Sequence, residues 1–337
     1  MPTPFRLEAT RGGIAESVHR VSVAVVDAQG RLVAEHGDPA LVAFWRSAAK
    51  PFQAMPMVAD GVADRLGFTA RELALACASH SSEPAHLEVV DGMLRKVGIG
   101  EEALACGPHP PLSPAVAEQV LRHGITMTPR WSNCSGKHTA MVAMARAHGW
   151  PVPGYERAEH PLQQRILAEV ARWTGLAEDR IVQGVDGCTV VSFGLPLAAM
   201  ALAYAQFGVS GEPAARRLRE AMAGFPEMIG GRNRLCTDLG LAARGAVIAK
   251  LGADGVYCAA LPGPGLGVAL KVEDGDMLSL GPALLGVLRA LAERLPLGFD
   301  PAGLGAAVDR HAEIPIHNTR GAVTGTLRAT GALRFPD

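Results

Sequence analysis

Lysine is scarce in this chain of 337 residues. The sequence holds 32 basic residues, but five are lysines, at positions 50, 96, 137, 250 and 271, and the rest are arginines. Arginine cannot lose its proton in a protein, so a position that needs a titratable amine must keep lysine. The few lysines are therefore the first candidates for chemistry.

Other features that the sequence lacks exclude several classes of protein. The net charge is −1 and the basic residues are scattered, so there is no footprint for nucleic-acid binding. The composition, with 48% hydrophobic and 19% charged residues, is that of a folded soluble chain. The opening MPTPFRLEATRGG has no apolar core like that of a secretory signal. We therefore expect a cytoplasmic protein whose six cysteines are reduced thiols.

One segment, residues 187–211, contains no charge and is long enough to cross a bilayer. Pro196 and Gly208 interrupt it, and the chain has no second segment of this kind. A helix that is apolar all round can equally lie at the centre of a large domain. We predict a buried core helix over residues 190–206 and no contact with a membrane.

Strand patterns occur at both ends of the chain, in VSVAVVD and RLVAEHG near the start and in GAVIAKLG, GVYCAALPG and GLGVALKVEDG after residue 244. Helical periodicity occupies the middle, over residues 70–78, 84–97, 113–123, 136–148, 160–174, 190–206 and 213–223. This order predicts an α+β fold with a mixed sheet built from both chain ends and an inserted helical region. We place a sheet domain at 1–45 and 240–337, a mainly helical domain at 46–239, and the site in the cleft between them.

The stretch FWRSAAKPFQAM sets Ser47 and Lys50 three positions apart. On a helix these two side chains share a face, which brings a hydroxyl within reach of an amine. A serine becomes a nucleophile when a base takes its proton, and lysine can be that base when its environment lowers its pKa. The alternative is an ordinary, partly exposed helix lysine. Because Pro51 is tolerated in a first turn, the helix should begin close to Ser47.

Three further clusters carry reactive side chains. ACASHSSEPAH includes Ser79 between two predicted helices, where helix capping is the simpler reading. WSNCSGKHTAM carries Cys134, Lys137 and His138 at a turn into a helix, where backbone N–H groups could bind an anion. QGVDGCTVV places two more candidates, Asp186 and Cys188, in a glycine turn.

The cysteine spacing matches no Cys-x-x-Cys motif and no zinc-finger pattern. By spacing alone, buried inert thiols are the more common outcome. Cys134 and Cys188 both lie in polar glycine turns, however, where a soft metal or a reactive thiolate is also found. Both interpretations stay open at this point.

Five blocks, FWRSAAKPFQAM, ASHSSEPAH, WSNCSGKHTAM, VDGCTVVSFGLPL and GLGVALKVEDG, occur in an order that resembles the rhizobial-type L-asparaginase II family. The resemblance covers nearly the whole chain. It implies a fold like that of serine β-lactamases and penicillin-binding proteins, hydrolysis of L-asparagine to L-aspartate and ammonia, and a homodimer. No Lys-Thr-Gly triplet is present, so β-lactam chemistry is not expected.

Carried over to this chain, the resemblance implies two Ser–Lys pairs, Ser47 with Lys50 and Ser79 with Lys271. The second pair is less secure, because Lys271 is placed by its strand context alone. The resemblance also implies a zinc site whose ligands are Cys134, Lys137, Cys188 and a water molecule. Arg46, His138 and Asp186 fall in the same blocks and are expected to hold the substrate or its surroundings.

The predicted reaction is attack by Ser47 or Ser79 on the side-chain amide of asparagine, followed by hydrolysis of the acyl-enzyme. Two alternatives remain open. One is a related serine amidase or acylase that acts on glutamine or a peptide-like amide. The other is a non-enzymatic zinc or thiol sensor built on Cys134 and Cys188.

Overall fold

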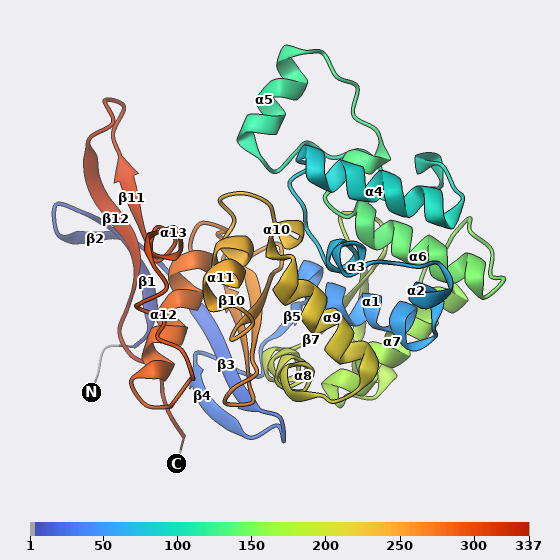
Figure 1. Ribbon diagram of the computed structural model, residues 1–337. Coiled ribbons are helices and arrows are strands. Elements are labelled where there is room, and N and C mark those ends of the chain that lie inside the picture. Colours follow the sequence, from blue (N-terminus) through green and yellow to red (C-terminus); the bar gives the residue numbers. More distant parts are fainter. Residues whose placement is uncertain (1–3, 337) are drawn as a thin grey trace. The chain divides into compact units, whose positions relative to one another are not determined.

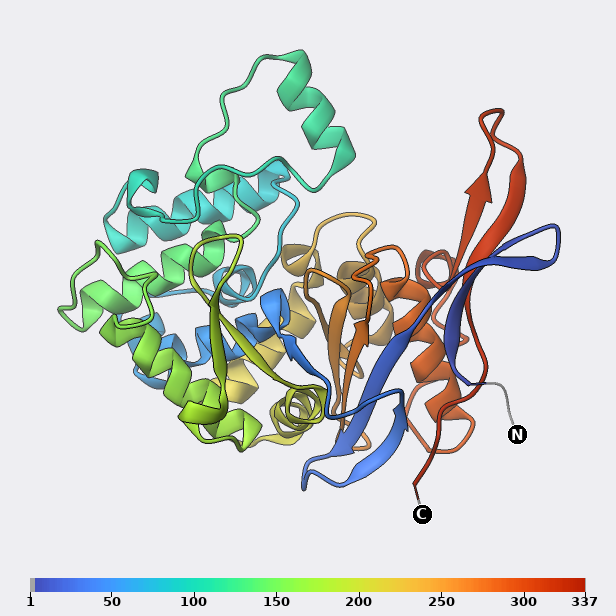
Figure 2. The ribbon, with the colours of Figure 1, turned by 180° about the vertical axis from the view of Figure 1, so that it is seen from behind.

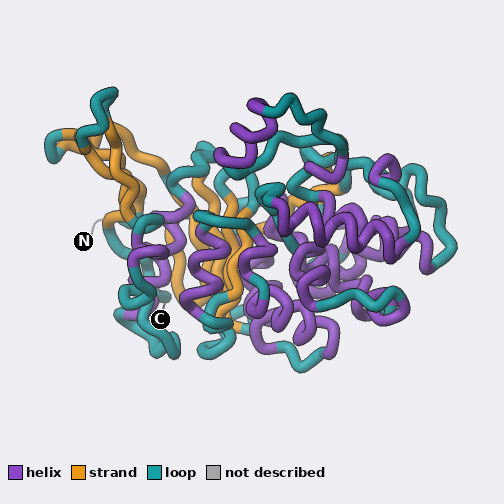
Figure 3. Tube along the Cα trace, turned by 45° about the horizontal axis from the view of Figure 1, so that its top comes forward, coloured by secondary structure: helices purple, strands orange, loops and turns teal. Residues whose placement is uncertain are grey.

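A computed structural model describes residues 4–336 of the chain. They form antiparallel sheets together with thirteen α-helices, which confirms the prediction of a chain that combines helices and strands. The chain divides into two compact units. Unit 1 comprises the residues up to Ala48, Leu195–Val209 and the residues from Asp238 onward, and unit 2 comprises Ala49–Gly194 and Ser210–Thr237. Most strands belong to unit 1, whereas unit 2 is mostly helical (Figure 3).

The main sheet of unit 1 joins strands from both ends of the chain, as predicted. Its order is β4-β3-β10-β9-β8, and its strands are β3 (Val21–Asp27), β4 (Leu32–His36), β8 (Ile248–Leu251), β9 (Val256–Leu261) and β10 (Leu266–Val272). The N-terminal strands lie beside the C-terminal ones in Figure 2 (blue and orange). Every pairing in this sheet is antiparallel, so the predicted mixed sheet is wrong here. The reason is that short turns join β3 to β4, β8 to β9 and β9 to β10, and such hairpins reverse the chain direction.

A second antiparallel sheet of unit 1 has the order β11-β12-β1-β2. It consists of β1 (Arg6–Arg11), β2 (Ile14–His19), β11 (Glu313–His317) and β12 (Val323–Thr330). α12 (Leu280–Ala292) packs against both sheets of unit 1 (Figure 1). Leucines of α12 supply the buried apolar side chains of this contact. The short α13 (Ala306–Asp309) precedes β11.

The uncharged segment does not form a single helix. β7 (Val191–Pro196) comes first, and α8 (Leu197–Val209) follows it. α8 packs on β10, β3 and β9, so the prediction of a helix over 190–206 within the helical region is wrong. Val190, Val191 and Phe193 near the start of the segment favour a strand. The alanine-rich part after Pro196 favours a helix.

The close approach of α8 to β10 depends on one glycine. A Cβ on Gly267 would lie 1.9 Å from the carbonyl oxygen of Ala201, which no side chain can tolerate. The helix therefore lies in backbone contact with the sheet.

Among residues 4–336, no helix combines the length and the apolar character that a bilayer crossing requires.

The helices of unit 2 are α1 (Lys50–Ala59), α2 (Val62–Arg65), α3 (Ala70–Ala76), α4 (Pro84–Val97), α5 (Pro114–Arg122), α6 (Ser135–Ala147), α7 (Pro161–Thr174), α9 (Pro213–Gly224) and α10 (Pro226–Ile229). The periodicity predicts α3 to α7 and α9, and α1 begins close to the predicted start at Ser47, whereas the short α2 and α10 lie outside the predicted ranges. α11 (Leu235–Ala243) crosses the boundary between the units. β6 (Val182–Val185) pairs with β7 as an antiparallel hairpin, and β5 (Val42–Phe44) precedes the first helical turn. The predicted domain boundaries and a site in a cleft between the domains stay predictions.

Candidate active site

Lys50 lies at the start of α1 and is 1% exposed. A 3₁₀ turn, Arg46–Ala49, precedes it and Pro51 follows in the first turn, so the helical segment begins one residue before the predicted Ser47. The buried amine donates hydrogen bonds to the carbonyl oxygen of Ala78 at 2.5 Å, Ser79 Oγ at 2.9 Å and Cys134 Sγ at 3.2 Å. Lys50 therefore joins a buried cluster of polar groups in unit 2 and is not an exposed helix lysine.

Ser79 follows α3 and is 5% exposed. Its backbone N–H donates to the carbonyl oxygen of Ile229 at 3.0 Å, which fixes the segment beside α10. The resemblance pairs Lys50 with Ser47 and Ser79 with another lysine. In the structure Lys50 of the first pair contacts Ser79 of the second. The catalytic roles of the two residues stay predictions.

Cys134 occupies the N-cap position of α6, where the helix dipole favours a negative charge. A hydrogen bond from the Cys188 thiol, opposed by burial and supported by Lys50 and Lys137, holds the pKa of Cys134 well below its usual range. The same bond, together with burial, raises the pKa of Cys188, so Cys188 keeps its proton. Two cysteines from distant segments thus lie close enough to shift each other's pKa in opposite directions.

Lys137 lies one turn into α6 and is 4% exposed. Its Nζ is 3.0 Å from Cys188 Sγ. Burial lowers the pKa of Lys137, but the neighbouring Cys188, Cys134 and Asp186 outweigh burial and raise it overall. The fold therefore brings together Cys134, Lys137 and Cys188, which are the three protein ligands of the predicted zinc site.

The chemistry of this donor set fits a soft divalent ion. Within residues 4–336, no group of three or more His, Cys, Asp and Glu side chains is arranged to hold a metal. Two sulfurs and an amine form a different set, and thiolates are preferred ligands of zinc. A dication would have to displace protons from Cys188 and Lys137, and its charge favours that displacement.

His138 and Asp186 lie beside these donors. The hydroxyl of Tyr155 and His138 Nδ1 are 2.5 Å apart, and the histidine is fully buried. Burial, with Lys137 and Lys50, lowers the pKa of His138 well below its usual range, so the ring is neutral. Asp186 Oδ1 accepts the backbone N–H of Cys188 at 3.3 Å, which shapes the turn between β6 and β7.

The remaining predicted residues belong to unit 1. Arg46 has a left-handed backbone with φ 52 and forms an ion pair with Asp254. Arg46 and Lys271 line one cavity of about 480 Å³, together with Asp254 and Glu273. Lys271 Nζ donates to the carbonyl oxygens of Val272 and Glu273, and Ser47 is half-buried in the 3₁₀ turn. Burial lowers the pKa of Lys271, and Asp274 and Glu273 oppose this.

Sequence reasoning missed three buried residues. His80 and Tyr155 contact the segments that carry the cluster, and Lys250 on β8 is fully buried with Nζ 2.8 Å from the carbonyl oxygen of Leu251. For Lys250 the scarcity of lysine was a usable signal. His80 and Tyr155 gave none, because their importance depends on contacts between segments far apart in the chain.

The comparison with known protein families identifies the family of the chain. The family model described as L-asparaginase II matches residues 7–329. The chain belongs to the L-asparaginase II family, and this membership supports an amidohydrolase of the asparaginase type with a small-molecule substrate.

Two solved structures also match. One, described as Mglu in its native form, is 18% identical over 88% of this chain and 69% of that chain, with a TM-score of 0.38. The other, Mglu in its tris and glutamate form, is 19% identical over 86% and 63%, with a TM-score of 0.35. Similarity at this level carries no conclusion about this chain. No curated protein matches it.

Proposed function

We propose that this chain hydrolyses L-asparagine to L-aspartate and ammonia, with Ser79 as nucleophile and Lys50 as its base. The observation that carries the proposal is the 2.9 Å contact between Lys50 Nζ and Ser79 Oγ inside a buried cluster. A lysine this close to a serine hydroxyl, shielded from water, has the geometry that general-base activation requires. Family membership supports the amide substrate.

In the proposed reaction Ser79 Oγ forms a bond to the side-chain amide carbon while its proton passes to Lys50 Nζ. The C–N bond then breaks, and the amide nitrogen leaves as ammonia after taking a proton from Lys50. Water adds to the resulting ester and gives its proton back through the amine. Cleavage of the ester releases L-aspartate and restores the Ser79 hydroxyl.

We also propose that Cys134, Lys137 and Cys188 hold a zinc ion, with water as the fourth ligand. When bound, the ion would supply positive charge that attracts and polarises a substrate oxygen. His138 and Asp186 would keep Lys137 and the Cys188 turn in place, and Arg46 would contact substrate. Ser47 and Lys271 are proposed as proton-transfer residues, following the family resemblance.

The finer assignments of fold and assembly belong to the same proposal. A five-stranded antiparallel sheet in one unit and a helical second unit are compatible with a serine β-lactamase-like fold. All six cysteines are free thiols, which is compatible with a reducing cytoplasm. We propose a homodimer, and light scattering on the purified chain measures its mass.

Ammonia release tests the proposal directly. Wild-type protein is assayed with asparagine, glutamine and a peptide-like amide, and Ser79→Ala is compared with Ser47→Ala. Since Ser79 is the proposed nucleophile, Ser79→Ala should lower kcat for asparagine at least about a hundredfold. If Ser47→Ala shows that loss and Ser79→Ala keeps more than about a tenth of the activity, Ser47 is the nucleophile instead.

The same assay separates the enzyme from its alternatives. A preference for glutamine or a peptide-like amide would make the chain a related amidase. The closeness of Cys134 and Cys188 also suits a zinc or thiol sensor. Metal binding or thiol oxidation with no ammonia release from any amide would favour that sensor.

A further inference from the structure

The segment that carries Ser79 is joined to the start of α6 by three hydrogen bonds. The backbone N–H of His80 donates to the carbonyl oxygen of Asn133 at 3.2 Å, and Ser82 Oγ donates to that of Trp131 at 2.7 Å. The third bond joins His80 Nε2 and Ser135 Oγ at 2.9 Å. These bonds connect the segment of Ser79 with the segment of Cys134.

The surroundings of His80 determine which ring nitrogen carries the proton. The backbone N–H of Ser82 donates to His80 Nδ1 at 3.2 Å, and a backbone amide is a donor only. Nδ1 is therefore the acceptor, so Nε2 carries the proton and donates it to Ser135 Oγ. His80 is fully buried, and burial lowers its pKa well below the usual value, with His86 and Lys50 acting in the same direction.

The backbone around these bonds has little freedom. Ser82 has φ 56, in the left-handed region that non-glycine residues rarely adopt because it strains the backbone. A Cβ on Gly136 would lie 2.5 Å from the carbonyl oxygen of Leu75, so the end of α3 and the start of α6 are in backbone contact. His80 thus bonds to two segments whose backbones are closely packed.

We propose that His80, as its Nε2–H tautomer, is a positioning residue that holds Ser79 Oγ and Cys134 Sγ within reach of Lys50 Nζ. It acts through its bonds to Ser135 and Ser82. The catalytic consequence rests on the proposed function of Ser79 and Lys50, whereas the tautomer and its contacts do not.

His86 is a matched control. It is 1% exposed and stacks on His80, with ring centroids 5.2 Å apart and planes at 18°. Its Nδ1 accepts the backbone N–H of Glu83 at 3.1 Å, and its Nε2 donates to the carbonyl oxygen of Glu227 at 2.9 Å. The two histidines thus make the same kinds of bonds, but His86 connects α4 with α10 and His80 connects the Ser79 segment with α6.

Three variants test the proposal by ammonia release and thermal unfolding: His80→Asn, His80→Gln and His86→Asn. His80→Asn should lower kcat at least about tenfold with KM changed less than about threefold, because the serine is misplaced while substrate binding persists. His80→Gln has an amide N–H that can reach Ser135 and should keep several times more kcat than His80→Asn. His86→Asn should keep kcat within about twofold despite a similar loss of thermal stability.

Equal losses of kcat in His80→Asn and His86→Asn would overturn the proposal, and so would full activity of His80→Asn. NMR of the wild-type chain with ¹⁵N-labelled histidine gives a test that needs no folded variant. The His80 signal should show a proton on Nε2, and a proton on Nδ1 would overturn the proposal. If the wild type releases no ammonia, the proposed function fails, and the NMR result still decides the tautomer separately.

Discussion

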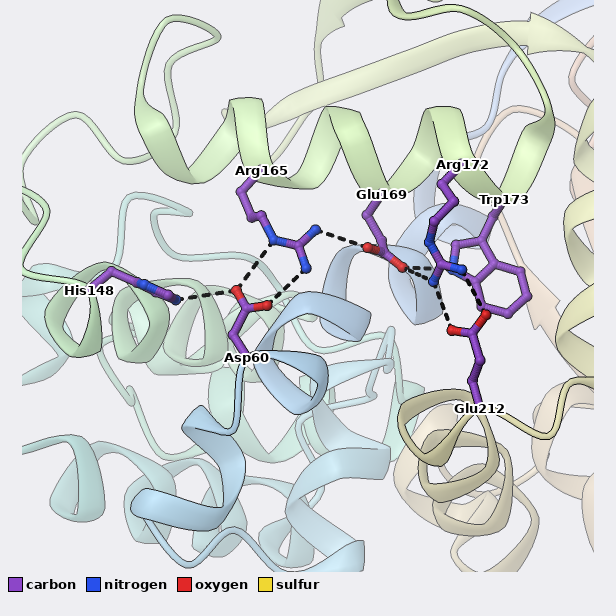
Figure 4. A network of polar contacts seen from close by, with 7 residues as sticks. All are labelled: Asp60, His148, Arg165, Glu169, Arg172, Trp173 and Glu212. Carbon is purple, nitrogen blue, oxygen red and sulfur yellow. Dashed lines mark hydrogen bonds and ion pairs between the residues drawn. The ribbon is translucent and has the colours of Figure 1, made fainter.

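Unit 2 contains two polar networks, one buried and one partly exposed, that use different chemistry. One is the active-site cluster of Lys50, Ser79, Cys134, Lys137 and Cys188. The other, the α7 network, links Asp60 at the end of α1, Arg165, Glu169 and Arg172 on α7, and Glu212 before α9 (Figure 4). His148 and Trp173 add further contacts, to Asp60 and to Glu169 respectively.

The difference lies in which groups can exchange protons. The α7 network pairs arginines, which stay charged, with carboxylates, so its bonds are fixed at neutral pH. The active-site cluster uses lysines and thiols, whose protonation depends on their neighbours. We infer that the α7 network stabilises helix packing and that the active-site cluster carries the proposed chemistry. Three substitutions and one pH series test this division, in order of decreasing expected effect.

The largest effect is expected for Lys50→Met, which removes the proposed base while keeping an unbranched buried side chain. The kcat for asparagine should fall at least about a hundredfold, measured by steady-state ammonia release. Lys96→Met is the control, because Lys96 Nζ pairs with Glu72 at 2.6 Å, outside the cluster. Lys50→Met with more than about a tenth of the wild-type kcat would end the role of Lys50 as base.

Lys137→Arg should come next, through metal binding. Arginine keeps the positive charge but offers no lone pair, so zinc affinity should fall by about ten- to a hundredfold or more. Metal analysis after dialysis measures the occupancy, and Lys250→Arg controls for a buried lysine elsewhere. Full zinc occupancy in Lys137→Arg would remove this residue from the metal site. Zinc loss with a raised KM and preserved kcat would assign the ion to substrate binding.

Glu169→Gln should affect stability and leave activity unchanged. Glu169 is 4% exposed and accepts hydrogen bonds from Arg165, Arg172 and the Trp173 indole. Loss of its charge should lower the free energy of unfolding by about 1–3 kcal/mol, measured by urea denaturation. A drop of tenfold or more in kcat would contradict the separation of the two networks.

The smallest effect is the pH dependence of that stability difference. Burial raises the pKa of Glu169, but the hydrogen bonds from Arg165, Arg172 and Trp173 outweigh burial and lower it overall. The unfolded chain therefore takes up the proton first as the pH falls, and the carboxylate's contribution is complete above the ordinary value of 4.5. The difference between wild type and Glu169→Gln should be constant above about pH 6 and shrink as the pH falls through the folded-state pKa. A difference that grows on acidification would show the opposite shift.

Much of the helical region could be predicted from periodicity and from capping residues. α4 and α9 begin at Pro84 and Pro213, and Gly98 caps the end of α4 in the left-handed conformation, all of which are local signals. The uncharged segment was misread because composition gives its apolar character but not the change from strand to helix at Pro196.

The candidate site could be predicted in its residues but not in its contacts. The family resemblance implies Cys134, Lys137 and Cys188 as one set, and the fold brings them together. The hydrogen bond between Lys50 and Ser79 crosses 29 positions, and no local pattern records such a distance. The segment of His80 resembles a helix-capping sequence. The role of His80 could not be predicted from it, because its bond to Ser135 spans 55 positions.

The contact between α8 and β10 at Gly267 also matters while the chain is being synthesised. α8 ends at Val209 and β10 begins at Leu266, so the ribosome adds several dozen residues before this part of the sheet can cover the helix. At about 5–20 residues per second this takes several seconds. During that time the nascent chain exposes an uncharged apolar segment, which is the kind of surface that chaperones bind and that promotes aggregation. A side chain at position 267 would keep α8 from packing closely on β10, so the apolar segment would stay partly exposed in the finished protein. Expression yield should therefore be as sensitive to a substitution of Gly267 as the stability of the folded protein is.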